Sequence, residues 1–151
     1  MSDQPEQIFD RLRETADFAE VDFSDVNACA SDGDNGLHCV VRWDDLTAAK
    51  ALMDAGIDVN RARDLGYTPL HVACMKGNAE MVKLLIEHGA DPFALSEGDT
   101  PFYTARVGGH DDICELLAAS MKEKQAADPK TWVRARIGQL RREIARLEQK
   151  L

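Results

Sequence analysis

The sequence predicts an all-α solenoid, in which short helix-turn-helix repeats with β-turn or hairpin loops stack on one another and an amphipathic helix follows at the C-terminus. Two observations lead to this fold class. Asp25-Val26-Asn27 recurs 33 residues later as Asp58-Val59-Asn60, and a period of this length is typical of stacked helical repeats. The end of the chain shows a heptad pattern of apolar residues, which predicts a separate amphipathic helix.

Length and composition set the limits of the prediction. The 151 residues are enough for one domain with one core. With 44% hydrophobic and 30% charged residues, the chain should fold rather than remain disordered. It has neither a run of 18 apolar residues nor the pattern of a secretory signal. We therefore expect a cytoplasmic protein, and the four cysteines, which form no CxxC pair, fit a reducing compartment.

The leading segment differs from the rest of the solenoid. Residues 5–30 match only the end of a repeat, so we expect residues 1–30 to form N-terminal capping helices, a degenerate copy. Recognisable repeats should occupy residues 31–120, because the segment 66–71 (GYTPLH) recurs as 98–103 (GDTPFY) and, in weaker form, as 33–38 (GDNGLH).

The central copy shows why each repeat should contain two short helices. Thr68 can cap the first helix, which is expected over residues 69–75 because proline suits a first helical position. Gly77 should end that helix, a second one is expected over residues 79–88, and Gly89 suits the left-handed residue that follows it. Helices this short are marginal alone, so they require stacking against neighbouring copies.

The stretch DLGYTPLHVACMKGNAEMVKLLIEHGAD, residues 64–91, resembles a near-consensus ankyrin repeat. Residues 31–63 resemble a more divergent copy and residues 96–119 a shortened one. The resemblance implies that His38 and His71 form hydrogen bonds between loops. It also implies that the family's partners bind a concave face lined by the loop tips and the first helix of each copy.

Carried over position by position, the resemblance implies a set of partner-binding residues on this concave face. They are Ser31, Asp32, Asp34, Arg42 and Trp43 in the first copy; Asp64, Leu65, Tyr67, Met75 and Lys76 in the second; and Ser96, Glu97, Asp99 and Val107 in the third. Five of these side chains are acidic and should form a strip along the loop tips. The large apolar ones, which no core pattern requires, are typical anchors of an interface; the alternative is that the acidic loops serve solubility and Trp43 packs on the N-terminal cap.

Charge indicates the kind of partner. Residues 1–119 hold 9 basic and 23 acidic side chains, a net charge of −14, whereas residues 120–151 hold 9 basic and 4 acidic ones, a net charge of +5. An acidic body repels the phosphates of nucleic acids. We therefore expect a protein partner with a basic surface, and neither a nucleic acid nor a membrane.

No catalytic or metal-binding pattern stands out. The sequence has no HExxH, GxSxG, P-loop or GxGxxG motif. His38, Cys39 and Cys74 lack the paired spacing of zinc ligands. We therefore expect no enzyme activity, no cofactor and no metal.

The C-terminal segment should begin with a linker over residues 121–130 and continue as a helix over residues 131–151. Its heptad seam can either contact another chain, in a homo-oligomer or a complex, or cover the last repeat as a cap. A parallel homodimer would oppose like charges, whereas an antiparallel register could oppose Arg141 and Glu148. The seam consists of Val133, Ile137, Leu140, Ile144, Leu147 and Leu151.

The function that these observations predict is protein–protein interaction without catalysis. A specific alternative is a bacterial-type immunity or inhibitor protein that neutralises a cognate toxin or enzyme. A second alternative is a scaffolding adaptor that dimerises through its C-terminal helix and recruits a client with its repeats.

Overall fold

The computed structural model describes residues 4–151, except for the side chains of Thr131, Trp132 and Ala135. Helices make up its regular structure, with two isolated β-bridges and no strand between residues 4 and 151. The all-α solenoid is therefore confirmed. The elements are α1 (Pro5–Arg13), α2 (Gly36–Arg42), α3 (Leu46–Asp54), the short 3-10 helix η1 (Asp64–Gly66), α4 (Pro69–Lys76), α5 (Ala79–Glu87), α6 (Pro101–Val107), α7 (Asp111–Ala127) and α8 (Pro129–Glu148).

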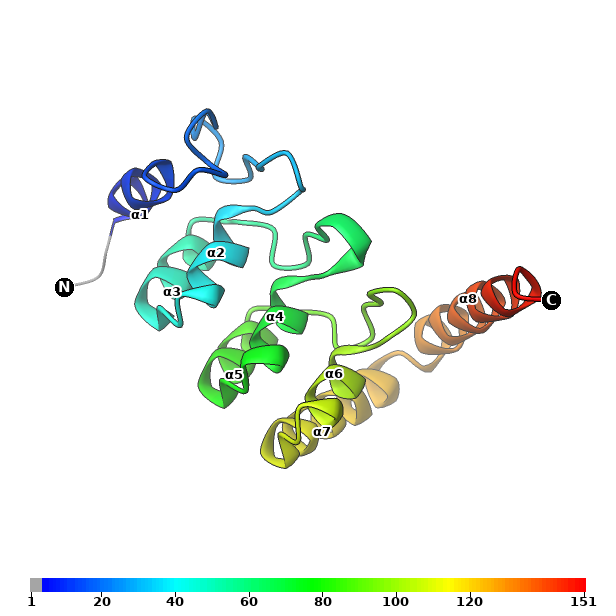
Figure 1. Ribbon diagram of the computed structural model, residues 1–151. Helices are drawn as coiled ribbons and strands as arrows, with labels where there is room; N and C mark the ends of the chain where they lie inside the picture. The colour runs from blue at the N-terminus through cyan, green and yellow to red at the C-terminus, as the bar shows by residue number, and fades with distance from the viewer. Residues whose placement is uncertain (1–3) are drawn as a thin grey trace.

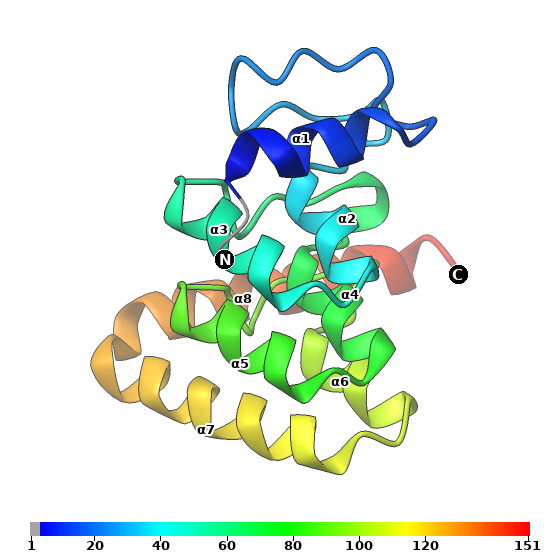
Figure 2. The ribbon, with the colours of Figure 1, turned by 90° about the vertical axis from the view of Figure 1, so that its left-hand side faces the viewer.

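The helices form two layers (Figures 1 and 2). The first helices of the three repeats, α2, α4 and α6, pack side by side in one layer, and the second helices, α3, α5 and α7, pack in the other. Each first helix also packs against the second helix of its own repeat. Helix α1 lies at the N-terminal end of the stack and α8 at the C-terminal end.

Local sequence signals explain where the helices begin and end. The side chains of Asn35 and Asn78 accept hydrogen bonds from the backbone N–H groups of His38 and Met81, which caps α2 and α5. Prolines occupy the first position of α4 and α6. Gly77 ends α4 in the left-handed conformation, with φ of 72°. The central copy thus has the predicted helix pair, to within a residue or so at each end.

One continuous core joins the repeats. Its fully buried side chains come from successive helices and include Leu37, Leu52, Leu70, Leu85 and Leu117. No single repeat could bury this surface alone, so each copy depends on its neighbours for stability.

The N-terminal cap differs from the expected helices. Between residues 4 and 30 the structure has one helix, α1, and then turns. Three aromatic rings close this end of the core: Phe9 stacks on Phe23 with centroids 4.8 Å apart, and Phe18 stacks on Phe23 at 5.7 Å.

The C-terminal part also differs from prediction. Helix α7 runs to Ala127 through most of the segment that was predicted to be a linker, 121–130. Residues 121–127 of that segment are Met, Lys, Glu, Gln and Ala, which favour helix, and no helix breaker occurs among them. Only Asp128 interrupts the helix, because Pro129 disfavours a helical conformation in the preceding residue.

Candidate protein-binding face

The candidate face is built from the layer of first helices and from the loops that precede them. Backbone hydrogen bonds join successive loop tips: Asp64 N–H donates to Asp32 O at 2.9 Å, and Glu97 N–H donates to Leu65 O at 3.1 Å. These bonds place the tips of all three repeats in one row, which Figure 1 shows projecting from the same side of the stack.

Two buried histidines hold each repeat against the next loop. The Nε2 atom of His38 lies 3.0 Å from Tyr67 O, and that of His71 lies 3.2 Å from Asp99 O. Burial lowers the pKa of both imidazoles, against the opposing effect of these carbonyl contacts. Both rings are therefore neutral at pH 7 and serve the structure rather than the surface.

Most of the predicted partner-binding side chains reach the surface. Trp43 is 38% exposed, Leu65 65%, Met75 55% and Val107 71%. The exposed members of the predicted set are Ser31, Trp43, Asp64, Leu65, Met75, Lys76, Glu97, Asp99 and Val107, and the half-buried ones are Asp32, Arg42 and Tyr67.

Two predicted members of the face are buried instead. Ser96 is 3% exposed, and its hydroxyl donates to Leu65 O at 3.0 Å, so it holds the second and third loop tips together. Asp34 is fully buried and does not belong to the acidic strip. We define the acidic strip as Asp32, Asp64, Glu97 and Asp99, whose side chains remain accessible.

Asp34 is buried because two arginines compensate its charge. Arg42 Nη1 lies 2.5 Å from Asp34 Oδ2, and Arg63 Nε lies 3.5 Å from Oδ1. The N–H groups are poorly aligned with the carboxylate, so these contacts are ion pairs rather than well-formed hydrogen bonds. Burial opposes the charge of Arg42, but its contacts with Asp34 and Cys39 together outweigh this effect and raise the pKa of the guanidinium. The cluster therefore links the first two loops.

Other contacts hold the borders of the face in place. Arg63 lies over the Tyr67 ring, 5.2 Å from its centroid, and Arg11 of α1 lies 5.0 Å from the centroid of Trp43. Lys76 donates to Arg42 O at 2.6 Å and pairs with Asp44 at 2.9 Å. The cationic members of the predicted set are thus engaged within the protein, which leaves the apolar and acidic ones to a partner.

Tyr103 is a surface residue that the predicted partner-binding set does not include. It occupies the repeat position of His38 and His71, yet it is 49% exposed. No fourth loop follows α6 to cover it, and its place in the last copy was the signal that could have identified it. We define the exposed apolar set as Leu65, Met75, Tyr103 and Val107, which belong to the second and third repeats.

The described residues contain no candidate metal site. They contain no group of three or more His, Cys, Asp or Glu side chains that could hold a metal ion. All four cysteines are free, and burial raises the pKa of Cys74 to about 12, which makes it a poor nucleophile. None of the helices in the described part of the chain is long and apolar enough to cross a membrane.

Comparisons with known proteins agree with the architecture. The family model for ankyrin repeats matches three copies, over residues 8–96 and 37–128. Potassium channel AKT1 of Oryza sativa subsp. indica is 44% identical over 100 residues, which are 64% of this chain and 11% of the channel. ARF GTPase-activating protein GIT2 of Mus musculus is 38% identical over 95 residues, 62% of this chain and 13% of the relative. The mouse 2-5A-dependent ribonuclease is 38% identical over 76 residues, 49% of this chain and 10% of the enzyme. The chain thus spans between 10% and 13% of the length of these relatives.

Proposed function

This chain belongs to the ankyrin-repeat family, and from that premise we propose that it binds a partner protein with a basic surface through the concave face, without catalysis. Ankyrin repeats generally mediate protein–protein interaction. The catalytic and transport activities in the names of the relatives belong to proteins of which this chain matches only a small part.

The observation that supports this proposal best is the exposed apolar set, together with the acidic strip on the loop tips. Leu65, Met75 and Val107 are each more than half exposed, although the fold needs none of them there. Large apolar side chains on one face commonly anchor an interface. They lie on the layer of first helices and on a loop tip that hydrogen bonds hold in position.

The acidic strip supports a basic partner. Its carboxylates lie on successive loop tips, and the N-terminal cap and the repeats together carry a net charge of −14 from 9 basic and 23 acidic side chains over residues 1–119. Such a surface attracts a cationic partner over several ångströms and accelerates association more than it increases affinity. Binding should therefore weaken as ionic strength rises.

Capture from a lysate of the source organism tests the proposal. The full chain is immobilised, and retained proteins are quantified by mass spectrometry at low and high salt. A partner of the concave face should be lost with Asp64→Lys/Glu97→Lys and with Leu65→Ser/Met75→Ser. The matched control is Glu80→Lys/Glu87→Lys, which makes the same charge change on exposed residues of α5. The proposal would be contradicted if every captured protein were retained equally by all variants.

An inhibitor or immunity protein is a narrower form of the same function. It requires that the captured partner be an enzyme or toxin and that the concave face cover its active site. The decisive measurement is the partner's activity with increasing amounts of the wild-type chain, and undiminished activity at saturation would exclude this role.

A further inference from the structure

We propose that two copies of this chain associate through their α8 helices, which pair antiparallel and are displaced by one heptad from full overlap. This inference concerns a different surface from the concave face. It rests on the exposed seam of α8, on the contacts that hold the opposite side of the helix, and on the charges beside the seam.

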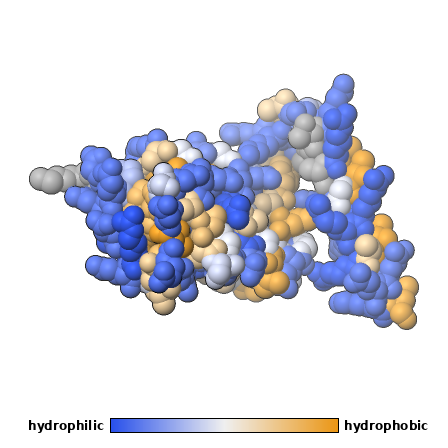
Figure 3. Space-filling model, turned by 90° about the horizontal axis from the view of Figure 1, so that it is seen from above, coloured by the Kyte–Doolittle hydropathy of each residue, from blue (hydrophilic) through white to orange (hydrophobic). Residues whose placement is uncertain are grey.

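The apolar seam of α8 faces away from the repeats. Its side chains are between 42% and 106% exposed, and Figure 3 shows hydrophobic surface along this end of the molecule. The capping alternative required the seam to be covered by the last repeat, but the last repeat does not cover it. An apolar stripe of this length on a surface helix indicates an interaction site.

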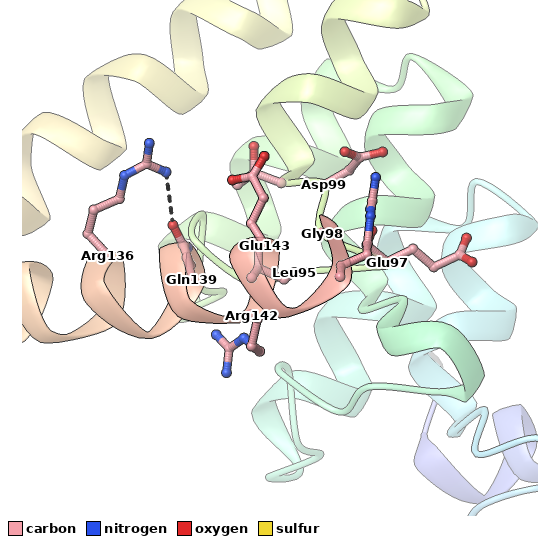
Figure 4. Close-up of a pocket in the computed structure, with 10 residues that line it drawn as sticks. Leu95, Glu97, Gly98, Asp99, Arg136, Gln139, Arg142 and Glu143 are labelled. Carbon is pink, nitrogen blue, oxygen red and sulfur yellow. Dashed lines mark hydrogen bonds between the residues drawn. The ribbon is translucent and has the colours of Figure 1, made fainter. Parts of the chain in front are cut away.

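The polar side of α8 is the side that contacts the protein's own repeats. Gln139 Nε2 donates to Phe93 O at 3.0 Å, and Arg146 donates to Glu97 O. A groove of about 1000 Å³ separates this side of α8 from the third loop (Figure 4). Gln139 and Arg146 are both at heptad position c, when Ile137 and Ile144 are at a. The helix can therefore keep these contacts while its a and d positions bind another helix.

Charges beside the seam disfavour the fully overlapping pairs. A parallel dimer would oppose Arg136 with Arg141 and Glu143 with Glu148 of its partner, all like charges. Full antiparallel overlap pairs Arg134 favourably with Glu148. However, it also opposes like charges: Arg136 faces Lys150 of the second copy, Arg141 faces Arg141, and Glu143 faces Glu143.

A displacement of one heptad removes every repulsion. Ile144 then faces Leu147 of the second copy, and Leu140 faces Leu151, which lies in the turn that directly follows α8. The flanking pairs become Arg141 with Glu148 and Glu143 with Lys150, each occurring twice and each of opposite charge. The opposite displacement pairs Arg136 with Glu143 but opposes Arg134 with Arg141. Charge complementarity therefore selects a second copy in a single register.

This register has a consequence for the assembly. The N-terminal ends of the two α8 helices point apart, so the two solenoids lie at opposite ends of the pair. The contact has four seam layers, which is short, and we expect a dimer that dissociates on dilution.

Sedimentation velocity of the full chain over a concentration series tests the proposal. The wild type should shift from monomer to dimer as concentration rises. Arg141→Glu and Glu148→Arg should each raise the dissociation constant about tenfold, because each replaces two attractions by two repulsions. The double variant restores opposite charges and should return close to the wild-type value. Ile144→Asp should abolish the dimer.

Control variants change the charge on the side of the helix opposite the seam, where Arg142→Glu makes the same change as Arg141→Glu and Gln149→Arg adds one positive charge. Arg142→Glu and Gln149→Arg lie at position f and should leave the dissociation constant unchanged. The seam is exposed in the monomer, so each variant should keep the helical circular dichroism of the wild type. A wild type that stays monomeric at every concentration overturns the proposal, as does a dimer that survives Ile144→Asp. A dimer strengthened by either single charge reversal shows a parallel pair and also overturns it.

Discussion

At the scale of single residues, the buried carboxylate of Asp34 determines how the first two loops fit together. It has no access to solvent, whereas the side chains of its partners Arg42 and Arg63 are 36% and 29% exposed. A buried charge without a partner is costly, whereas a paired one fixes geometry. Asp34 therefore positions the face without being part of its surface.

Asp34→Asn should lower the free energy of unfolding by about 2 kcal/mol, less than for a fully buried pair because both arginines keep part of their hydration. The amide has nearly the same shape but removes the counter-charge of Arg42, and it leaves Arg63 only the carboxylate of Asp32, 4.0 Å away. Urea denaturation at pH 7 measures the change. Asp64→Asn, on the exposed strip, should stay within about 0.5 kcal/mol. Equal effects of the two substitutions would show that Asp34 is not held as an ion pair.

Leu65 combines exposure with a strained backbone. Its φ of 65° lies in the left-handed region, where residues other than glycine, asparagine and aspartate are rare. The apolar side chain is 65% exposed, so the fold gains little from it. Strain that the fold does not need is often associated with a functional site.

Leu65→Asn should therefore stabilise the chain by about 0.5–1 kcal/mol, since asparagine tolerates this conformation. Capture of a concave-face partner should nevertheless fall, because an apolar anchor is lost. Thermal unfolding and quantitative capture measure the two effects on the same preparation. If stability and capture both fell, Leu65 would be a structural residue rather than a binding one.

At the same scale, residue types and repeat positions could predict which part of the molecule forms the face but not which side chains reach its surface. Asp64 and Glu97 are exposed as expected, whereas Asp34 is buried. The difference depends on Arg63, which approaches Asp34 only after two repeats have stacked. The pattern of residues within each repeat cannot predict such a contact between two repeats.

At the scale of helices, glycines at the helix ends have different neighbours. Gly77 and Gly89 both follow a helix with positive φ, 72° and 90°. A Cβ atom on Gly77 would lie 2.4 Å from the His110 ring, whereas one on Gly89 would have no atom within 4 Å. The first glycine is thus required by both conformation and space, the second by conformation alone.

Gly89→Ala should cost about 1 kcal/mol, the penalty of placing alanine in a left-handed conformation. Gly77→Ala should cost clearly more, about 2–3 kcal/mol, because the His110 ring must also move. The difference between the two urea midpoints isolates the steric part. Gly77→Ala/His110→Ala should recover some of that difference, and no recovery would place the clash elsewhere.

The helices also show which boundaries the sequence can predict. The pair around Gly77 was predicted to within a residue or so, because proline, glycine and capping residues mark its ends. Helix α7 was not, since residues 121–127 contain neither a breaker nor a seam and so read equally well as a polar linker. Helix ends that are marked by local residues were predicted accurately. The end of α7, which depends on helix propensity alone, was not.

At the scale of the whole molecule, side chains of the C-terminal segment complete the loop ladder. Within the repeats, Asp32 O and Leu65 O accept bonds from the backbone of the following loop. Glu97 O, at the same position of the last loop, accepts from Arg146 instead, and Phe93 O accepts from Gln139. Helix α8 thus provides donors in place of a missing fourth repeat and ends the solenoid.

Loss of these donors should loosen the last repeat more than the first. In a solenoid each repeat depends mainly on its neighbours, so damage at one end stays local unless the stack is very cooperative. Gln139→Ala/Arg146→Ala should lower the protection of α6 amides by about 1 kcal/mol, the contribution of two partly solvated side-chain hydrogen bonds. Amides of α2 should exchange as in the wild type. Hydrogen–deuterium exchange with mass spectrometry measures both helices in one experiment.

The control for this prediction is Arg142→Ala/Gln149→Ala, which shortens one side chain of α8 and one directly after it. The donors to the carbonyls of Phe93 and Glu97 are instead Gln139 and Arg146. All four positions lie off the apolar seam, so self-association through α8 is not altered by either variant. Equal loss of protection in α2 and α6 would show that the repeats unfold as one unit. Unchanged protection in α6 would show that α8 does not stabilise the last repeat.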